Sequence, residues 1–163
     1  ATVMNSLAMQ DALDKIGQPA VVMSGLAMPR VCDEFTQRDA IAQLEKGKVV
    51  ICAAGTGNPY FTTDTAGCLR AIEIKADVIM KATKVNGVFD SDPMKNPDAK
   101  RFEMLTYDEV LEKNLQVMDA TAVVLCRDNK LPLRIFNLND EGALPEALVN
   151  QSIGTEVVMG EDK

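Results

Sequence analysis

The sequence predicts an α/β protein, a three-layer α/β/α sandwich around a mainly parallel sheet. Short apolar runs of strand-like composition alternate with segments of helical periodicity, and this alternation is typical of a parallel sheet with helices on both faces. The run 48–54 is apolar on both faces, as expected for a buried parallel strand. Because 163 residues are enough for a hydrophobic core, we expect residues 1–163 to form one domain.

The first half of the chain is predicted to contain three helices and two strands. Residues 1–16 have apolar side chains at helical spacing and no preceding strand, so the sequence is expected to begin inside a domain. Thr36 is the predicted N-cap of the second helix. The predicted ranges are helix 1–16, strand 20–23, helix 36–45, strand 48–54 and helix 62–76.

The second half continues the alternation around a long loop. Residues 84–100 are rich in turn-forming residues, and a loop of this length usually has a function. Thr106 and Glu109 have the spacing of a capping box, and Asp119 is a predicted N-cap. The predicted ranges are strand 77–83, a short helix ending near 114, helix 119–129, strand 133–138, helix 143–151 and strand 155–159.

Composition argues against several classes of function. The formal net charge of −7 disfavours nucleic acid as a partner, because the chain would repel a phosphate backbone. The absence of histidine excludes Ser-His-Asp catalysis and histidine metal sites. No apolar run is long enough to span a membrane and no signal peptide is recognisable, so we expect a cytoplasmic protein with no membrane partner.

The four cysteines do not have the spacing of a metal or redox motif. None of them forms a C-x-x-C pair, and three lie in apolar stretches. We expect reduced core cysteines and no metal site made by protein side chains. The cysteines are Cys32, Cys52, Cys68 and Cys126.

The most informative segment is 55–64, between an apolar run and a predicted helix. Gly55 and Gly57 would let backbone N–H groups approach an anion closely. The segment also supplies neutral hydrogen-bonding side chains and one carboxylate, that of Asp64. It matches neither the P-loop nor the GxGxxG pattern. A phosphate or nucleotide site and an ordinary surface loop therefore remain equally weighted alternatives.

The loop 84–100 is a second candidate for ligand binding. Ligands of open parallel sheets lie beyond the carboxyl ends of the strands. Strands 48–54 and 77–83 are consecutive and joined by one helix, so a right-handed crossover would place the loops that follow them on the same rim. Two neighbouring small-molecule sites would suit transfer of a group between two ligands.

Each candidate residue in these regions also has a purely structural interpretation. Asp64 and Asp119 could be no more than helix-capping residues. Lys81 is expected to face solvent rather than a phosphate. Phe89 could be loop packing, and Asp92 could belong only to an Asp-Pro turn.

Several motifs taken together resemble the bacterial uridylate kinases (UMP kinases) of the amino acid kinase family. The two most specific are Ala54-Gly-Thr-Gly-Asn-Pro-Tyr-Phe-Thr-Thr-Asp64 and Lys81-Ala-Thr-Lys-Val-Asn-Gly-Val-Phe-Asp-Ser-Asp-Pro93. Shorter matches occur at 1–9, 71–74, 105–107, 117–119 and 131–137, so the resemblance covers nearly the whole chain. It implies a C-terminal portion of an amino acid kinase domain.

The resemblance implies transfer of the γ-phosphoryl group of ATP to UMP with Mg²⁺, in pyrimidine nucleotide biosynthesis. It also implies a homo-oligomer, a hexamer in this family, with allosteric regulation by GTP and UTP. Asp64 and Asp119 would be catalytic. The implied UMP-binding residues are Thr56, Gly57, Asn58, Pro59, Tyr60, Phe61, Thr62 and Thr63, and the implied ATP-binding residues are Thr83, Phe89 and Asp92.

The sequence departs from the family pattern at its start, where the family's lysine-bearing strand and two glycine-rich loops are not found. We therefore expect these 163 residues alone to be inactive or nearly so, and a full-length parent to be an active kinase. One alternative is a non-catalytic module that binds or responds to a uridine nucleotide. Another is a kinase of this family that acts on a carboxylate or carbamate, which the neutral Thr/Asn-rich segment disfavours.

Overall fold

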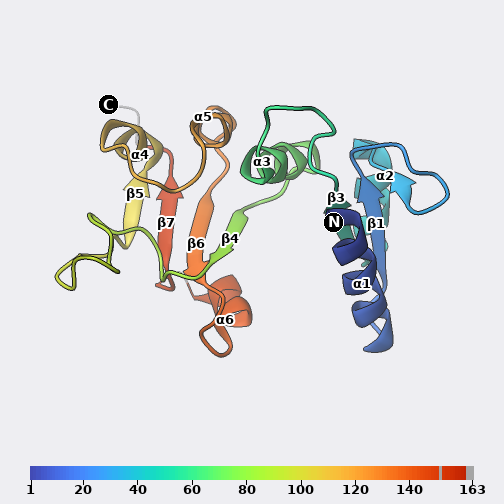
Figure 1. The fold of residues 1–163 in the computed structure, drawn as a ribbon, viewed down its shortest axis with the longest axis horizontal. Coiled ribbons are helices and arrows are strands. Elements are labelled where there is room, and N and C mark those ends of the chain that lie inside the picture. Colours follow the sequence, from blue (N-terminus) through green and yellow to red (C-terminus); the bar gives the residue numbers. More distant parts are fainter. Residues whose placement is uncertain (151, 161–163) are drawn as a thin grey trace. The chain divides into compact units, whose positions relative to one another are not determined.

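A computed structural model describes residues 1–150 and 152–160 of the chain, which divides into two compact units (Figure 1). The first unit comprises residues 1–74 and the second residues 75–163. Each unit has its own sheet and its own helices. The expectation of a single domain remains a prediction.

The first unit contains a three-stranded parallel sheet in the order β2-β1-β3. Helix α1 packs against β1 and β3, and α2 packs against β3. The elements are α1 (Thr2–Lys15), β1 (Ala20–Ser24), β2 (Asp33–Glu34), α2 (Gln37–Leu44), β3 (Val49–Ala53) and α3 (Thr63–Glu73).

Threonine caps explain where two of these helices begin. The Thr36 hydroxyl accepts a hydrogen bond from the Asp39 amide at 3.1 Å, which confirms the predicted N-cap of α2. The Thr62 hydroxyl accepts one from the Thr65 amide at 3.2 Å at the start of α3. The second cap matters for function, because it fixes the point at which the glycine-containing segment becomes a helix.

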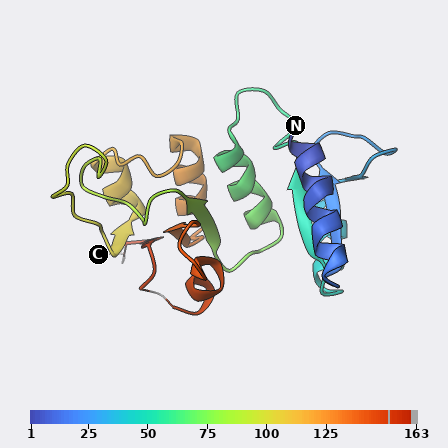
Figure 2. The same ribbon diagram turned by 60° about the horizontal axis from the view of Figure 1, so that its bottom comes forward.

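The second unit contains a four-stranded sheet in the order β4-β6-β7-β5. Strands β4 and β6 are parallel, as are β5 and β7, whereas β6 and β7 are antiparallel. Helix α6 lies on one side of these strands, and α4 and α5 lie on the other (Figure 2). The elements are β4 (Ile79–Thr83), β5 (Met104–Thr106), α4 (Tyr107–Glu112), α5 (Ala120–Asp128), β6 (Leu133–Asn137), α6 (Ala143–Val149) and β7 (Thr155–Val158).

Strand β6 is the central packing element of the second unit. Phe136 packs with Ala143 and Ala147 of α6 in one buried cluster. Leu133 and Ile135 are also buried and alternate with Phe136 along the strand, so they lie on its opposite face. The predicted α/β class and the mainly parallel pairing are confirmed.

One expectation about the strands is wrong. Strand β3 is not a buried central strand, because it lies at the edge of its sheet with Val49 and Cys52 exposed. Strand β4 belongs to the second unit and is at the edge of the sheet there. That the loops after β3 and β4 lie on one rim remains a prediction.

The other predicted elements are confirmed with small changes in their ends. The two short strands β2 and β5 were not predicted, because two or three residues are too few to show a period of two. The expected end of the last helix, Gln151, lies outside the described residues. Among residues 1–150 and 152–160, no helix has the length and apolar character needed to cross a membrane.

The cysteines match the expectation only in part. Cys68 and Cys126 are buried, Cys32 is partly buried and Cys52 is exposed, and all four are free thiols. The expectation of four core cysteines is therefore wrong for Cys52, because the strand that carries it is an edge strand. Desolvation of the thiol raises the pKa of Cys52, an effect that Arg70 opposes and Glu73 reinforces.

Candidate functional site

The loop between β3 and α3 has an unusual backbone, and we call residues 54–62 the acceptor loop. Four of its residues have a positive φ: Ala54 at 59°, Gly55 at 62°, Gly57 at 76° and Tyr60 at 70°. Within the part of the chain that the structure describes, the N–H groups of Gly55 and Thr56 have no hydrogen-bond acceptor. Unpaired backbone donors beside a helix N-terminus are a feature of anion sites.

Close backbone contact with a second loop explains why glycines occur here. A Cβ atom on Gly57 would lie 2.3 Å from the carbonyl oxygen of Gly25, which follows β1. A Cβ atom on Gly25 would lie 2.5 Å from the carbonyl oxygen of Gly55. The loops after the neighbouring strands β1 and β3 therefore touch through their backbones. Sequence analysis missed Gly25, although its position directly after a strand was a usable indication.

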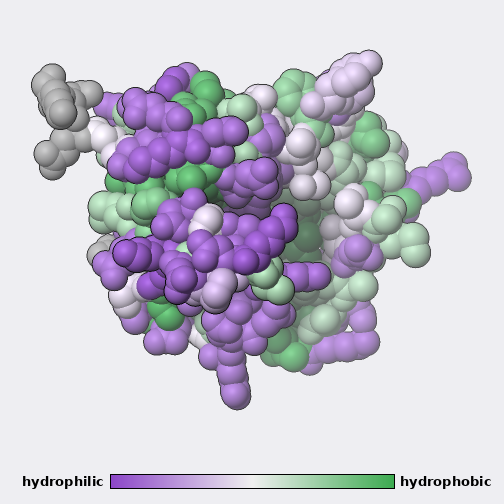
Figure 3. Space-filling model, turned by 60° about the vertical axis from the view of Figure 1, so that its left-hand side comes forward, coloured by the Kyte–Doolittle hydropathy of each residue, from purple (hydrophilic) through white to green (hydrophobic). Residues whose placement is uncertain are grey.

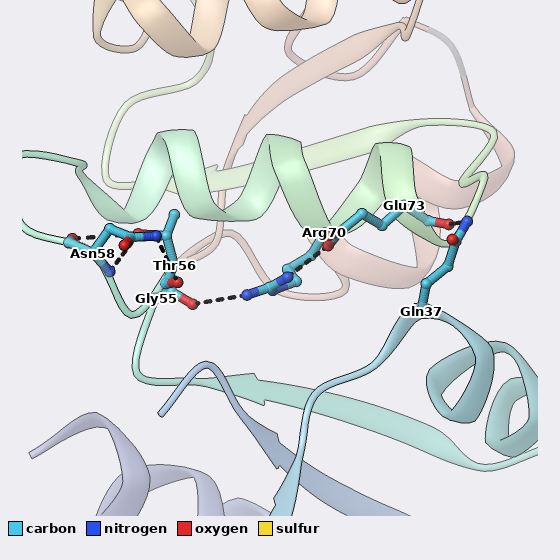
Figure 4. Close-up of polar contacts among 6 residues, drawn as sticks. All are labelled: Gln37, Gly55, Thr56, Asn58, Arg70 and Glu73. Atoms are coloured by element: carbon cyan, nitrogen blue, oxygen red, sulfur yellow. Dashed lines mark hydrogen bonds and ion pairs between the residues drawn. The ribbon is translucent and has the colours of Figure 1, made fainter. Parts of the chain in front are cut away.

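Thr56 and Asn58 stabilise the acceptor loop by contacts within it (Figure 4). The Asn58 amide nitrogen donates to the Thr56 hydroxyl at 3.1 Å, and the Asn58 side chain donates to the Thr56 carbonyl at 3.4 Å. Tyr60 is fully exposed and Phe61 is about half exposed. The loop therefore has some polar contacts of its own and two exposed aromatic side chains available to a ligand.

Asp64 lies in the first turn of α3, where a carboxylate interacts favourably with the helix dipole. Its expected position in the first turn is thus confirmed, although the N-cap is Thr62, and its catalytic role remains a prediction. Thr62 caps the same helix, and Thr63 is its first residue. The structure thus places the predicted UMP-binding residues, 56–63, in one continuous loop and helix start.

Arg70 of α3 links the helix to the acceptor loop (Figure 4). Its Nη2 lies 3.4 Å from the Gly55 carbonyl oxygen, and its Nη1 lies 2.6 Å from Oε2 of Glu73. The guanidinium also lies over the ring of Phe35, 3.9 Å from the ring centroid. The Gln37 side chain donates to the Glu73 carbonyl at 2.6 Å. Sequence analysis did not identify this arrangement.

In the second unit, the loop after β4 borders a pocket of about 590 Å³, and we call residues 84–103 the donor loop. Phe89 and Asp92 line this pocket together with residues 113–116, which follow α4. Thr83 is not part of the lining. Its hydroxyl instead accepts from the Val85 amide at 3.0 Å and donates to the Val85 carbonyl at 2.7 Å. Two of the three predicted ATP-binding residues are thus brought together.

The donor loop is held mainly by its own side chains, and its side of the unit has a largely hydrophilic surface (Figure 3). The Asp92 carboxylate accepts from the Met94 amide at 2.9 Å, which confirms the turn interpretation of this residue. The Asp90 carboxylate accepts from the Lys100 amide at 3.0 Å. This bond and that from the Ser91 hydroxyl lower the pKa of Asp90.

Lys81 and Asp119 have structural contacts of their own. Nζ of Lys81 donates to the Val117 carbonyl at 2.9 Å, and the residue is partly buried, so the expectation that it simply faces solvent is wrong. The Asp119 carboxylate accepts from the Ala122 amide at 3.1 Å, which confirms the N-cap of α5. A catalytic role for Asp119 remains a prediction. The described residues contain no group of three or more Cys, Asp or Glu side chains placed to hold a metal ion.

The sequence was also compared with protein families and with individual known proteins. Residues 1–137 match the model of the amino acid kinase family. The chain is 59% identical over 155 residues to the uridylate kinase of Ectopseudomonas mendocina and 57% identical over 161 residues to that of Pseudomonas putida. These alignments cover 95% and 99% of this chain, but only 63% and 65% of the relatives.

A solved structure shows the same fold. The UMP kinase of Bacillus anthracis matches with a TM-score of 0.93 and 34% sequence identity, over 96% of this chain and 65% of that one. The chain therefore spans slightly less than two thirds of the length of each of these proteins. The resemblance expected from the two sequence motifs is confirmed, and this chain belongs to the amino acid kinase family.

Proposed function

We propose that the protein to which these residues contribute transfers the γ-phosphoryl group of ATP to UMP, giving UDP and ADP. The observation that carries the proposal is the acceptor loop, where the unpaired N–H groups of Gly55 and Thr56 precede the N-terminus of α3. Relatives with 57–59% identity over nearly all of this chain are named uridylate kinases, which supports the same substrate.

The acceptor loop has the chemistry that a nucleoside monophosphate requires. Its backbone donors and the positive end of the α3 dipole suit the phosphate. Thr56, Asn58 and Thr63 supply neutral hydrogen-bonding groups for the ribose and the uracil. Tyr60 and Phe61 are exposed aromatic side chains on which a base can stack. A carboxylate substrate would instead require a cationic pocket.

The donor loop suits ATP by its shape and its lining. Its pocket of about 590 Å³ is large enough for a purine and ribose. Phe89 would contact the base, and the Asp92 carboxylate would accept hydrogen bonds from ribose hydroxyl groups. Thr83 would contact ATP at the start of the loop. Its hydroxyl also forms two hydrogen bonds with the backbone of Val85.

The proposed reaction requires positioning and charge neutralisation more than acid–base chemistry. An oxygen of the UMP phosphate attacks the γ-phosphorus of ATP while the bond to the β,γ-bridging oxygen breaks, and ADP leaves. Asp64 and Asp119, which belong to different units, each offer hard oxygen atoms of the kind that Mg²⁺ prefers. Mg²⁺ would be bound largely through the phosphates of ATP and would neutralise their charge.

Formation of UDP from UMP and Mg-ATP, followed by chromatography, tests the proposal. A protein of the relatives' full length that contains these residues should form UDP, whereas we expect the 163 residues alone to show little or no turnover. A full-length protein that phosphorylates a carboxylate or carbamate but not UMP would contradict the proposal. Binding of UMP at 55–64 without turnover by any longer form would favour a non-catalytic uridine-nucleotide module.

The family resemblance also leads us to propose a homo-oligomer, a hexamer, that responds to GTP and UTP and works in the cytoplasm. In support of self-association, α1 and the residue that caps its C-terminus have large exposed apolar side chains, Met4, Met9 and Ile16. Light scattering coupled to gel filtration would measure the molar mass of a protein of the relatives' full length that contains these residues. A monomeric mass at micromolar concentration would contradict the proposed hexamer.

A further inference from the structure

The environment of Arg70 differs from that of an ordinary surface arginine. Its side chain is only 12% exposed, and its guanidinium reaches three separate segments of the first unit. One contact is to Glu73 in its own helix, one is to the ring of Phe35 after β2, and one is to the Gly55 carbonyl in the acceptor loop. An arginine can make these contacts together because its planar group donates at its edge while its face stacks on a ring.

The contact with Gly55 has a geometric consequence. The Gly55 carbonyl and the Thr56 N–H belong to one planar trans peptide unit, so they point in opposite directions. A donor that holds the carbonyl on one side therefore aims the N–H to the other side. That N–H has no acceptor among the described residues of the chain. A hydrogen bond from a cation to the carbonyl also polarises the peptide and makes its N–H a stronger donor.

The rest of the loop determines this orientation only in part: the Gly57 amide donates to the Ala54 carbonyl at 3.3 Å and closes a turn around the Gly55–Thr56 peptide. Gly55 and Gly57 both have a positive φ, and glycine has wide freedom to change its φ and ψ angles. Thr56 and Asn58 bond only to each other within the loop. The hydrogen bond from the Gln37 side chain to the Glu73 carbonyl joins the segment after β2 to the end of α3. This bond helps to keep the Phe35 ring against the Arg70 guanidinium.

We propose that Arg70 is a positioning residue for acceptor binding, because it orients the Gly55–Thr56 peptide so that the Thr56 N–H donates to the phosphate of the acceptor nucleotide. Arg70 does not touch the nucleotide in this arrangement. The inference rests on the proposed function of the acceptor loop, since it names the residue that prepares that loop for its ligand.

UMP titrations of a protein of the relatives' full length that contains these residues, followed by calorimetry and by the ¹⁵N–¹H resonance of Thr56, test the inference. Arg70→Met should weaken UMP binding at least about tenfold, because a charge-assisted hydrogen bond is lost. It should also abolish the UMP-induced shift of the Thr56 resonance, while binding of ATP changes less than twofold. Arg70→Lys keeps the charge and should recover part of the UMP affinity, which a purely structural role does not require.

The control variant is Arg38→Met, because Arg38 is in the same unit but its side chain is 92% exposed. It should bind UMP like the unaltered chain. If Arg70→Met does not fold, Phe35→Leu decides the question, because it removes the ring under the guanidinium but keeps an apolar side chain. A folded Arg70→Met or Phe35→Leu with unchanged UMP affinity and an unchanged Thr56 shift would overturn the inference and leave the proposed function intact. Failure of the unaltered protein of full length to bind UMP would instead overturn the acceptor assignment, and this inference with it.

Discussion

The acceptor loop and the donor loop follow the edge strands β3 and β4, but different interactions hold them in place. The acceptor loop is short, contains four residues with a positive φ, and is held by neighbours outside it, Gly25 and Arg70. The donor loop is long and is held largely by its own Asp and Asn side chains, which accept hydrogen bonds from nearby amides.

This difference indicates where each loop is vulnerable. Among the described residues, two backbone donors of the acceptor loop have no acceptor, and the shape of the loop depends on close packing and on Arg70, whose side chain is 12% exposed. The donor loop satisfies its amides locally, and its pocket is completed by the separate segment 113–116. We expect single substitutions in the acceptor loop to cause large losses of UMP affinity. Most single substitutions in the donor loop should cause smaller losses of ATP affinity.

Loss of either of the two carboxylates is expected to have the largest effect. Asp64→Asn and Asp119→Asn, in a protein of the relatives' full length, should each lower kcat about 100-fold if both groups act on the transferring phosphoryl group. Asparagine also caps helices well, so the free energy of unfolding of Asp119→Asn should change by less than about 1 kcal/mol. Kinetics and urea unfolding measure the two effects.

The control for this prediction is Asp128→Asn, because Asp128 is at the end of α5 and pairs with Arg127. It should leave kcat unchanged. Unchanged turnover in Asp119→Asn, with lower stability in Asp119→Ala, would show that Asp119 only caps its helix.

The acceptor loop should not tolerate a side chain at Gly57. In Gly57→Ala the Cβ atom would lie 2.3 Å from the Gly25 carbonyl oxygen, at a residue with φ of 76°. We expect stability to fall by about 2–4 kcal/mol and UMP affinity to fall by at least about tenfold. Gly67→Ala is the matched control in α3, where the Cβ atom meets open space, and it should stabilise the chain by about 0.5–1 kcal/mol.

The donor loop has one position of the same kind, Gly87. A Cβ atom there would lie 2.4 Å from Oγ1 of Thr155, at a φ of 103°. Gly87→Ala should weaken ATP binding about tenfold, an estimate based on the cost of overpacking, and leave UMP binding unchanged. The control is Gly142→Ala, which has a similar positive φ but no nearby atoms. Equal losses of ATP and UMP affinity in calorimetry would contradict the separation of the two loops.

The smallest expected effect is a pH dependence confined to the donor loop. Hydrogen bonds from Lys100 and Ser91 lower the pKa of Asp90, so the native state binds fewer protons than the unfolded chain. The stabilisation is complete above the ordinary carboxyl pKa of about 4 and is lost as the pH falls through the lower native value. The Lys100 amide resonance should therefore move on acidification.

Val85 provides an internal control for this titration, because neither its side chain nor the Thr83 hydroxyl that accepts from its amide titrates in this range. The Val85 amide resonance should move less than that of Lys100 between pH 6 and pH 2. Equal movement of both would indicate general unfolding of the loop rather than protonation of Asp90.

The sequence by itself determined the order and type of the main elements, and it located the two loops that we propose bind the nucleotides. Helix caps such as Thr36 and the Thr106–Glu109 pair were predictable, because capping depends on residues three apart in the chain. The position of the acceptor loop was predictable for a related reason, since its glycines, threonines and asparagine lie together between a strand and a helix.

Only the tertiary structure decided which residues hold those loops and which strands lie at sheet edges. The residues that hold the acceptor loop, Gly25, Phe35 and Arg70, are all distant in sequence from Gly55. No local pattern distinguishes them from other arginines, aromatic residues or glycines. The apolar run of β3 looked central, yet it lies at an edge, because strand order is set by contacts between distant segments rather than by local composition.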